Sequence, residues 1–309
     1  MIPLLLLVTI VVFCLVKLAP GDAWSQEVDP TLAPEDIERQ RVLMGQRDPL
    51  YVQYLSWLTQ VLKGNFGVSL SKQVPVAQLI GERLGNTLFL ALTSLIITLL
   101  FSIPLAILAS QKPCSPLDYA SSTLALLGLA LPNFYAGLLA IYFFSFKLGW
   151  FPAQGTGSFG VELSGWSLVV DRLHHVFLPA LTLGLASTAI YLRHLRSELL
   201  DVLGQDYIRT ARAKGLSEQA VLYKHGLRNA LIPLITLLGF EFGSLVSGAV
   251  IIETVFSWPG IGKLFLEAVQ NRDYPVIMAI NLITALMLFI GNLLADLFYA
   301  WADPRIRYQ

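Results

Sequence analysis

The sequence predicts an all-α integral membrane protein with six membrane-spanning helices. Hydrophobic residues make up 55% of the 309 residues, and charged residues only 14%. The apolar residues gather into long runs, which a helix in lipid requires and a water-soluble core does not. Lys and Arg are denser in the segments on one side of those runs, and this bias predicts an orientation in the membrane.

Six runs approach or reach the roughly 20 mostly apolar residues that a spanning helix needs. Their approximate bounds are Ile2–Leu18, Leu88–Ala109, Ala120–Phe146, Val176–Leu192, Ala230–Ile252 and Val276–Trp301. The first run is interpreted as a retained span, because no Lys or Arg precedes Lys17 as a secretory signal would require. Prolines within or at the ends of the runs are tolerated as kinks: Pro104, Pro132, Pro179 and Pro233.

The basic residues predict that both termini face the cytoplasm. Ten of the 21 Lys and Arg residues fall in the segments placed inside by this orientation, at about twice the density of the outer segments. They are Lys112, Arg193, Arg196, Arg209, Arg212, Lys214, Lys224, Arg228, Arg305 and Arg307. The predicted organisation is a first helix at 1–18, an extracytoplasmic cap at 19–87, a five-helix core at 88–301 and a cytoplasmic tail at 302–309.

The inner loop at 193–229, between the fourth and fifth predicted helices, is the most informative stretch. Its pattern predicts a helix from Asp206 to Lys214, Gly215 as a left-handed C-cap, and Ser217 as the N-cap of a second helix. The first helix is small on one side, at Thr210, Ala211 and Ala213, and basic on the other, at Arg209, Arg212 and Lys214. Such a surface suits insertion into a groove of another protein. The alternative is a solvated loop whose charges only follow the positive-inside rule.

Two motifs in this loop are distinctive: RTARAKGL, from Arg209 to Leu216, and HGLRNALIP, from His225 to Pro233. They resemble the cytoplasmic EAA loop of the dipeptide and oligopeptide permease family of ABC transporters. The resemblance continues along the chain at Ala19–Asp22, Asp48–Tyr54, Gly64–Gly67, Glu253–Gly262, Arg272–Pro275 and Asp303–Arg307. Two departures stand out. Only the last residue of the acidic-Ala-Ala pattern is kept, and the start at Met1 lacks the family's Arg-rich leader, which suggests a truncated N-terminus.

The resemblance implies the architecture of an ABC importer permease in the bacterial inner membrane. It implies that eight residues couple the chain to an ATPase: Arg209, Thr210, Ala211, Arg212, Ala213, Lys214, Gly215 and Leu216. The implied partners are a second homologous permease, two ABC ATPase subunits that hold ATP and Mg, and an extracytoplasmic solute-binding protein. No cofactor is expected in this chain. Peptide is the expected solute, with nickel or glutathione as alternatives.

Polar residues inside the predicted spans are candidates for the solute pathway or for a subunit interface. They are Glu241, Asn281 and Asp296. As coupling carboxylates, Glu241 and Asp296 would instead indicate an ion-coupled secondary transporter. His174 and His175 are adjacent, but no Cys or His joins them, so interfacial anchoring is favoured over a metal site. Pro259, Gly260 and Gly262 predict a tight re-entrant turn.

Several functional classes lack their motifs. The sequence has no GxxxxGK[ST] phosphate loop, so the chain is not expected to hydrolyse ATP itself by that mechanism. It has no HExxH and no GxSxG, so no hydrolase chemistry is visible. A formal net charge of +0 gives no reason to expect a nucleic-acid partner.

Overall fold

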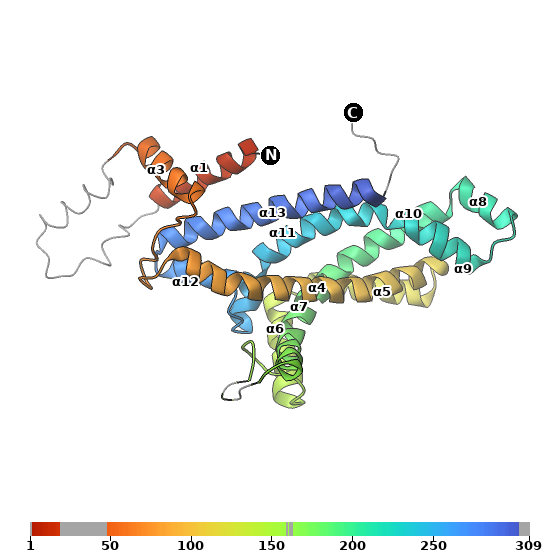
Figure 1. Ribbon diagram of the computed structural model, residues 1–309. Coiled ribbons are helices and arrows are strands. Elements are labelled where there is room, and N and C mark those ends of the chain that lie inside the picture. Colours follow the sequence, from red (N-terminus) through yellow and green to blue (C-terminus); the bar gives the residue numbers. More distant parts are fainter. Residues whose placement is uncertain (1, 19–47, 159, 161–162, 303–309) are drawn as a thin grey trace, which may run out of the picture. The chain divides into compact units, whose positions relative to one another are not determined.

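The computed structural model describes residues 2–18, 48–158, 160 and 163–302 (Figure 1). Its regular elements in these ranges are helices, joined by turns and by a non-helical segment between Lys147 and Trp166, and one isolated bridge pairs Val68 with Pro75. Side chains are described at these positions except 2, 124, 129, 236, 240–248 and 299–302. Two compact units are formed, one by residues 1–85 and 263–286 and the other by residues 86–262 and 287–309.

The longest helices contain the predicted second, fourth and sixth spans and run beyond them. They are α4 (Val76–Gln111), α7 (Trp166–Leu203) and α13 (Tyr274–Ala302), and all three are long and apolar enough to cross a membrane. At 1.5 Å per residue, the 38 residues of α7 extend about 57 Å, well beyond a hydrocarbon core of about 30 Å. The first twelve residues of α4, 76–87, belong to the predicted cap, and α7 continues into the predicted inner loop.

The predicted third span, Ala120–Phe146, is not one straight helix. α5 (Pro116–Ala130) ends, and α6 (Asn133–Ala140) and the π-helix η2 (Ile141–Lys147) continue after a bend of 101°. Pro132 explains the break, because it has no N–H to donate and disfavours helical backbone in the residue before it. Leu131 accordingly has extended angles, φ −82° and ψ 123°.

The remaining apolar helices are α1 (Ile2–Leu18), at 17 residues, and α11 (Ile232–Val255), at 24 residues. They coincide with the first and fifth predicted spans. The described side chains therefore give three helices that pass as membrane spans, or four when the bent pair is taken as one.

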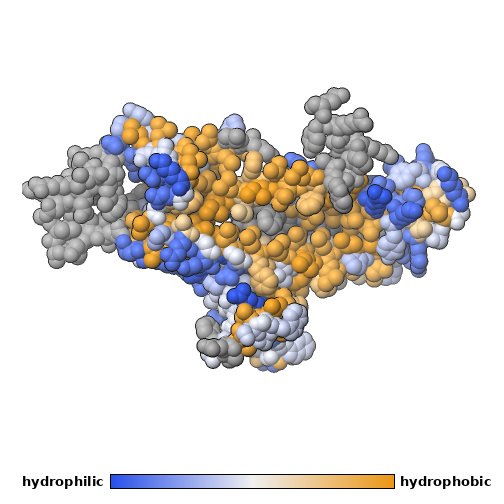
Figure 2. All heavy atoms as spheres, viewed as in Figure 1, coloured by the Kyte–Doolittle hydropathy of each residue, from blue (hydrophilic) through white to orange (hydrophobic). Residues whose placement is uncertain are grey.

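The middle of α4 buries several polar side chains and exposes several apolar ones. Ser94, Thr98 and Ser102 are buried, whereas Ile96 and Leu100 are about two-thirds exposed, at 64% and 65%. Thr98 donates to the carbonyl oxygen of Gly184 on α7 over 3.1 Å. Such an inverted distribution fits lipid, where apolar side chains face the solvent and polar ones bond between helices. Figure 2 shows hydrophobic side chains over α4, α5 and α11, and hydrophilic ones around α8 and α9.

A bulkier residue than glycine has no room where α7 meets α4. A Cβ added at Gly184 would lie 2.8 Å from the Ser94 carbonyl oxygen and 3.0 Å from Cγ2 of Ile97. The same holds between α11 and α13, where a Cβ at Gly239 would lie 2.3 Å from Cβ of Ala295. Small residues thus let the helix backbones approach closely, as is usual in membrane bundles.

The first unit joins α1, α3 (Leu50–Leu62), most of α12 (Ile261–Gln270) and the start of α13. Phe13 of α1 packs against Tyr54 and Trp57 of α3, with ring centroids 5.5 Å and 6.5 Å away. The buried Asp273 accepts hydrogen bonds from Ser71 Oγ at 2.8 Å and from the hydroxyl of Ser69. The part of the predicted cap at residues 48–75 is therefore folded, and residues 19–47 lie outside the described ranges.

Candidate functional site

The inner loop contains the two short helices predicted around a glycine. α8 spans Asp206–Ala213, and Gly215 follows with φ +80°, in the left-handed region. The N–H of Gly215 donates to the carbonyl of Arg212 over 2.9 Å, which closes the turn. Ser217 Oγ then accepts from the N–H of Ala220 and caps α9 (Glu218–Ala220), so the predicted caps of this loop are confirmed.

Beyond α9 the loop continues as a π-helix, η3 (Val221–Leu227), and a short α10 (Arg228–Ala230) that leads to α11. Gly226 of η3 lies against α7, where an added Cβ would be 3.2 Å from Cδ2 of Leu203. Leu222, Ala230 and Leu234 pack with Leu195 and Leu199 of α7 and with the end of α4. Single π-helical turns are common at functional sites, and this one anchors the loop to two long helices.

Ala211 does not lie on the exposed surface that the sequence predicts for it. It is buried together with Ile208 and Val221, and the three pack near Leu203. The helical period explains this placement, since Ala211 is three residues after the apolar Ile208 and shares its face. A bulky residue at Ala211 would therefore disrupt the loop itself rather than a docking surface.

The opposite face of the loop is open in this chain. Thr210 and Ala213 of α8 are exposed. Three larger side chains nearby in the sequence are exposed as well: Tyr207, Leu216 and Tyr223. The exposed groups of the loop thus include two tyrosines, a residue type that is enriched in protein interfaces.

The basic side of α8 is partly neutralised. Arg212 makes a two-pronged contact with Glu218 across the Gly215 turn, at 2.9 Å and 3.2 Å, and Arg209 lies 3.3 Å from Asp206. Both pairs are solvent-exposed, so each contributes little to stability. The Arg212–Glu218 contact spans the Gly215 turn between α8 and α9.

A second cluster joins the start of the second predicted span to the turn after the fifth. Glu253 is fully buried at the end of α11, and Thr87 Oγ1 of α4 donates to it over 2.7 Å. The Thr87 hydroxyl in turn accepts from the N–H of Ile261 at 2.8 Å. We call Asn86, Thr87, Glu253 and residues 258–261 the Glu253 turn.

Asn86 completes the Glu253 turn from α4. Its side-chain amide donates to the carbonyl of Pro259 over 2.9 Å, and its own carbonyl accepts from the indole N–H of Trp258 over 3.0 Å. Gly260 has no room for a side chain, because a Cβ there would lie 2.1 Å from Oε1 of Glu253. The tight turn predicted at Pro259 and Gly260 is present, and its organising carboxylate was not among the predicted site residues.

Of the three pathway candidates, Asn281 and Asp296 have described side chains. Asn281 donates to the carbonyl of Ile277 on its own helix and lines a cavity of about 390 Å³ with residues of α1, including Val12 and Val16. Asp296 is exposed, and the described part of the chain offers it no hydrogen bond or ion pair. The side chain of Glu241 lies outside the described positions.

The two adjacent histidines point to separate partners. Nε2 of His174 lies 2.7 Å from the carbonyl oxygen of Trp150, and Nδ1 of His175 lies 2.8 Å from that of Asp171. A carbonyl can only accept, so each ring nitrogen must carry the proton. Among the described residues no group of three or more His, Cys, Asp or Glu could hold a metal ion.

Two family models together match most of the chain. Residues 102–308 match the "Binding-protein-dependent transport system inner membrane component" family, and residues 1–91 match the N-terminal region model of the same transport systems. The chain belongs to this family. The expected resemblance to peptide permeases is thereby confirmed at the level of the family, which is a transport component and not an enzyme.

Curated relatives in this family match along nearly their whole length. An oligopeptide transport system permease protein, AppB, of Bacillus subtilis is 48% identical over 308 residues, covering 99% of this chain and 96% of the relative. A putative peptide permease protein of Brucella suis is 43% identical over 98% of this chain and 95% of that protein. The glutathione transport system permease protein GsiC of Salmonella typhimurium is 41% identical over 100% and 96%.

Solved structures share the fold at low sequence identity. A chain of the MetNI methionine ABC transporter, in an inward-facing conformation, aligns with a TM-score of 0.58 at 14% identity, over 73% of this chain and 97% of that one. An amino acid ABC transporter aligns with a TM-score of 0.53 at 17% identity, over 72% and 93%. The helical fold described above is therefore shared with membrane chains of these two ABC transporters.

Proposed function

We propose that this chain forms half of the translocation pathway of an ATP-driven importer for peptides. The observation that carries the proposal is the match to an oligopeptide permease at 48% identity over 99% of the chain. Glutathione, itself a small peptide, is the second candidate, because glutathione permeases match at 41% over the full chain. The test is ATP-dependent uptake of a labelled pentapeptide, and of labelled glutathione, by the reconstituted transporter.

In the proposed arrangement the chain crosses the bacterial inner membrane six times. The spans are α1, α4, the bent pair α5–α6 with η2, α7, α11 and α13. Residues 19–75 and the Glu253 turn face outward, and the loop from α8 to α10 faces the cytoplasm with both termini. The basic residues of the loop support this orientation.

The proposed orientation predicts the behaviour of topology reporters. A reporter that is active only in the cytoplasm should be active when fused after Gln309 and inactive when inserted after Lys63, at the end of α3. A periplasm-active reporter should give the opposite pattern at the same two positions. If the fusion after Gln309 reports the periplasm, the loop lies on the wrong side for an ATPase.

The loop is proposed to dock on an ATPase partner through its open face. Thr210, Ala213, Leu216 and Tyr207 are the contacts that the exposed side chains of the loop favour, while Gly215 sets the angle at which they are presented. Arg209, Arg212 and Lys214 flank this face, and Ala211 supports it from beneath. ATP and Mg would be held by two such ATPases, and this chain needs no cofactor of its own.

The other proposed partners are a second, homologous permease and an extracytoplasmic solute-binding protein. Asp296 supports the first of these. It lies on a face of α13 whose neighbours Leu293, Leu297 and Phe298 are exposed, and a carboxylate among apolar groups in a membrane is stabilised by facing protein or water. Glu241 and Asn281 stay candidates for the pathway or this interface.

A further inference from the structure

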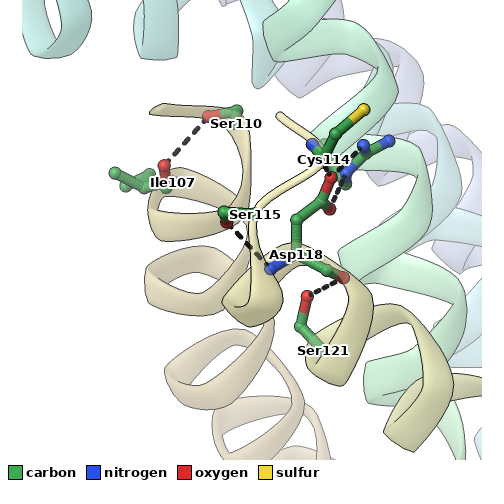
Figure 3. A network of polar contacts seen from close by, with 7 residues as sticks. Ile107, Ser110, Cys114, Ser115, Asp118 and Ser121 are labelled. Atoms are coloured by element: carbon green, nitrogen blue, oxygen red, sulfur yellow. Dashed lines mark hydrogen bonds and ion pairs between the residues drawn. The ribbon is translucent and has the colours of Figure 1, made fainter. Parts of the chain in front are cut away.

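The carboxylate of Asp118 links three segments of the second compact unit. These segments lie at the end of the unit where the inner loop is found. Asp118, which is 4% exposed, accepts from Arg196 of α7 through both prongs of the guanidinium, at 2.6 Å and 2.7 Å. It also accepts from the backbone N–H of Cys114 at 2.9 Å (Figure 3). Parallel prongs of this kind are among the strongest and most directional contacts that proteins make.

The same carboxylate fixes the turn from α4 to α5. Cys114 has φ +59°, an unusual conformation for a residue with a side chain, and its N–H points to Asp118. Ser115 caps α5 by accepting from the N–H of Asp118 at 3.2 Å. Asp118 therefore holds the α4–α5 turn, the first turn of α5 and α7 in one arrangement (Figure 3).

Arg196 lies on α7, close to the part of the inner loop that runs from α8 to α10. Eight residues separate it from Gly204, where α7 ends, a distance of about 12 Å along the helix. Its neighbours Leu195 and Leu199 pack against Leu222 and Ala230 of the loop. A displacement of the loop would therefore move this turn of α7.

From these contacts we infer that Asp118 and Arg196 are a positioning pair, which transmits movement of the inner loop from α7 to α5. The inference rests on the proposed function. α5 packs along α7, and after the bend at Pro132 α6 packs against both α7 and α11. A rigid link between α5 and α7 makes the two helices move together, so the bent segment follows the loop. Without the link, α7 can move while α5 stays behind.

Stability alone does not account for the pair. Taking the Asp118 carboxylate out of water has a cost, which is only partly spared because the Arg196 side chain stays 27% exposed, and apolar residues of similar volume often stabilise a fold as well or better. The charged pair instead fixes geometry, since the two N–H donors of the guanidinium match only one orientation of the carboxylate. A role in positioning therefore predicts that Lys, which keeps the charge but not the fork, does not replace Arg196.

The test uses the assembled transporter in proteoliposomes, with its solute-binding protein loaded with a pentapeptide. Arg196→Lys is expected to keep assembly and the basal rate of ATP hydrolysis within about twofold while lowering peptide-stimulated hydrolysis about tenfold, since a lysine cannot form both prongs. Asp118→Asn keeps an acceptor for the backbone N–H of Cys114, and it should show the same loss of peptide-stimulated hydrolysis. The double variant should be no worse than either single one, because both remove the same link.

Arg193→Gln is the matched control, because Arg193 is an exposed cation one turn earlier on α7 with no hydrogen bond or ion pair among the described residues. It should leave the stimulation unchanged. Wild-type stimulation in Arg196→Lys, or losses that multiply in the double variant, would overturn the inference while leaving the proposed function intact. Absence of peptide stimulation in the unmodified transporter would instead contradict the proposed function.

Discussion

Gly215→Val is expected to abolish peptide uptake while the chain still inserts in the membrane and assembles with its partners. Gly215 has φ +80°, and a β-branched residue in that region costs on the order of 1–2 kcal/mol. Nothing lies within 4 Å of an added Cβ, so the effect arises from the backbone and not from a clash. The strain is relieved when the turn rotates, which changes the angle between α8 and α9.

A rotated turn misplaces the docking face. The Arg212–Glu218 contact spans the turn and would be broken, and Thr210 and Ala213 would no longer be presented together with Leu216. We expect peptide-stimulated ATP hydrolysis to fall to the basal rate, measured on the purified transporter. Binding of peptide to the solute-binding protein should not change.

Gly215→Asn is the matched control, because asparagine is among the residues with a side chain that adopt the left-handed region most readily. It should retain most of the uptake. Lys224→Gln should also cost little, since this exposed lysine has no described partner to lose. If Gly215→Val transports peptide at the normal rate, the loop is only a charged connector.

Gly260→Val is expected to have the largest effect on folding. The added Cβ would lie 2.1 Å from Oε1 and 2.3 Å from Cδ of Glu253, and the carboxylate is held by Thr87 and enclosed on all sides. Overpacking of this kind costs about 1–3 kcal/mol or more, and loss of the buried hydrogen bond adds to it. The yield of monodisperse protein in detergent should fall severely, and its melting temperature with it.

Gly85→Ala provides the control for Gly260→Val, because a Cβ at Gly85 meets nothing within 4 Å and alanine favours a helix over glycine. Its yield and melting temperature should equal or exceed those of the unmodified protein. A normal melting temperature for Gly260→Val would show that the Glu253 turn is not tightly packed.

The sequence predicts the helices of this chain better than it predicts their ends. Long apolar runs locate α4, α7 and α13 because a helix in the bilayer core needs apolar side chains. α7 nevertheless continues for eleven residues past the predicted span, since a helix can extend beyond the hydrocarbon core. Pro132 is visible in the sequence, whereas the 101° bend depends on how α6 packs afterwards. Such packing involves residues far apart in the chain.

The same distinction holds for the candidate site. Gly215 and Ser217 are recognisable because capping depends on local residue types. Ala211 could have been placed inside from its helical spacing to Ile208. The links from Asp118 to Arg196 and from Thr87 to Glu253 join residues 78 and 166 positions apart, and nothing local in the sequence pairs them.

ATP hydrolysis by partner subunits is expected to drive solute through this chain. The most direct measurement is uptake of a labelled pentapeptide by proteoliposomes that contain the chain, its partner permease, the ATPases and the solute-binding protein. Uptake should require ATP on the side of the membrane where the ATPases lie. It should persist when proton and sodium gradients across the membrane are collapsed. Uptake that continues without ATP and stops when those gradients are collapsed would contradict the account and identify an ion-coupled transporter instead.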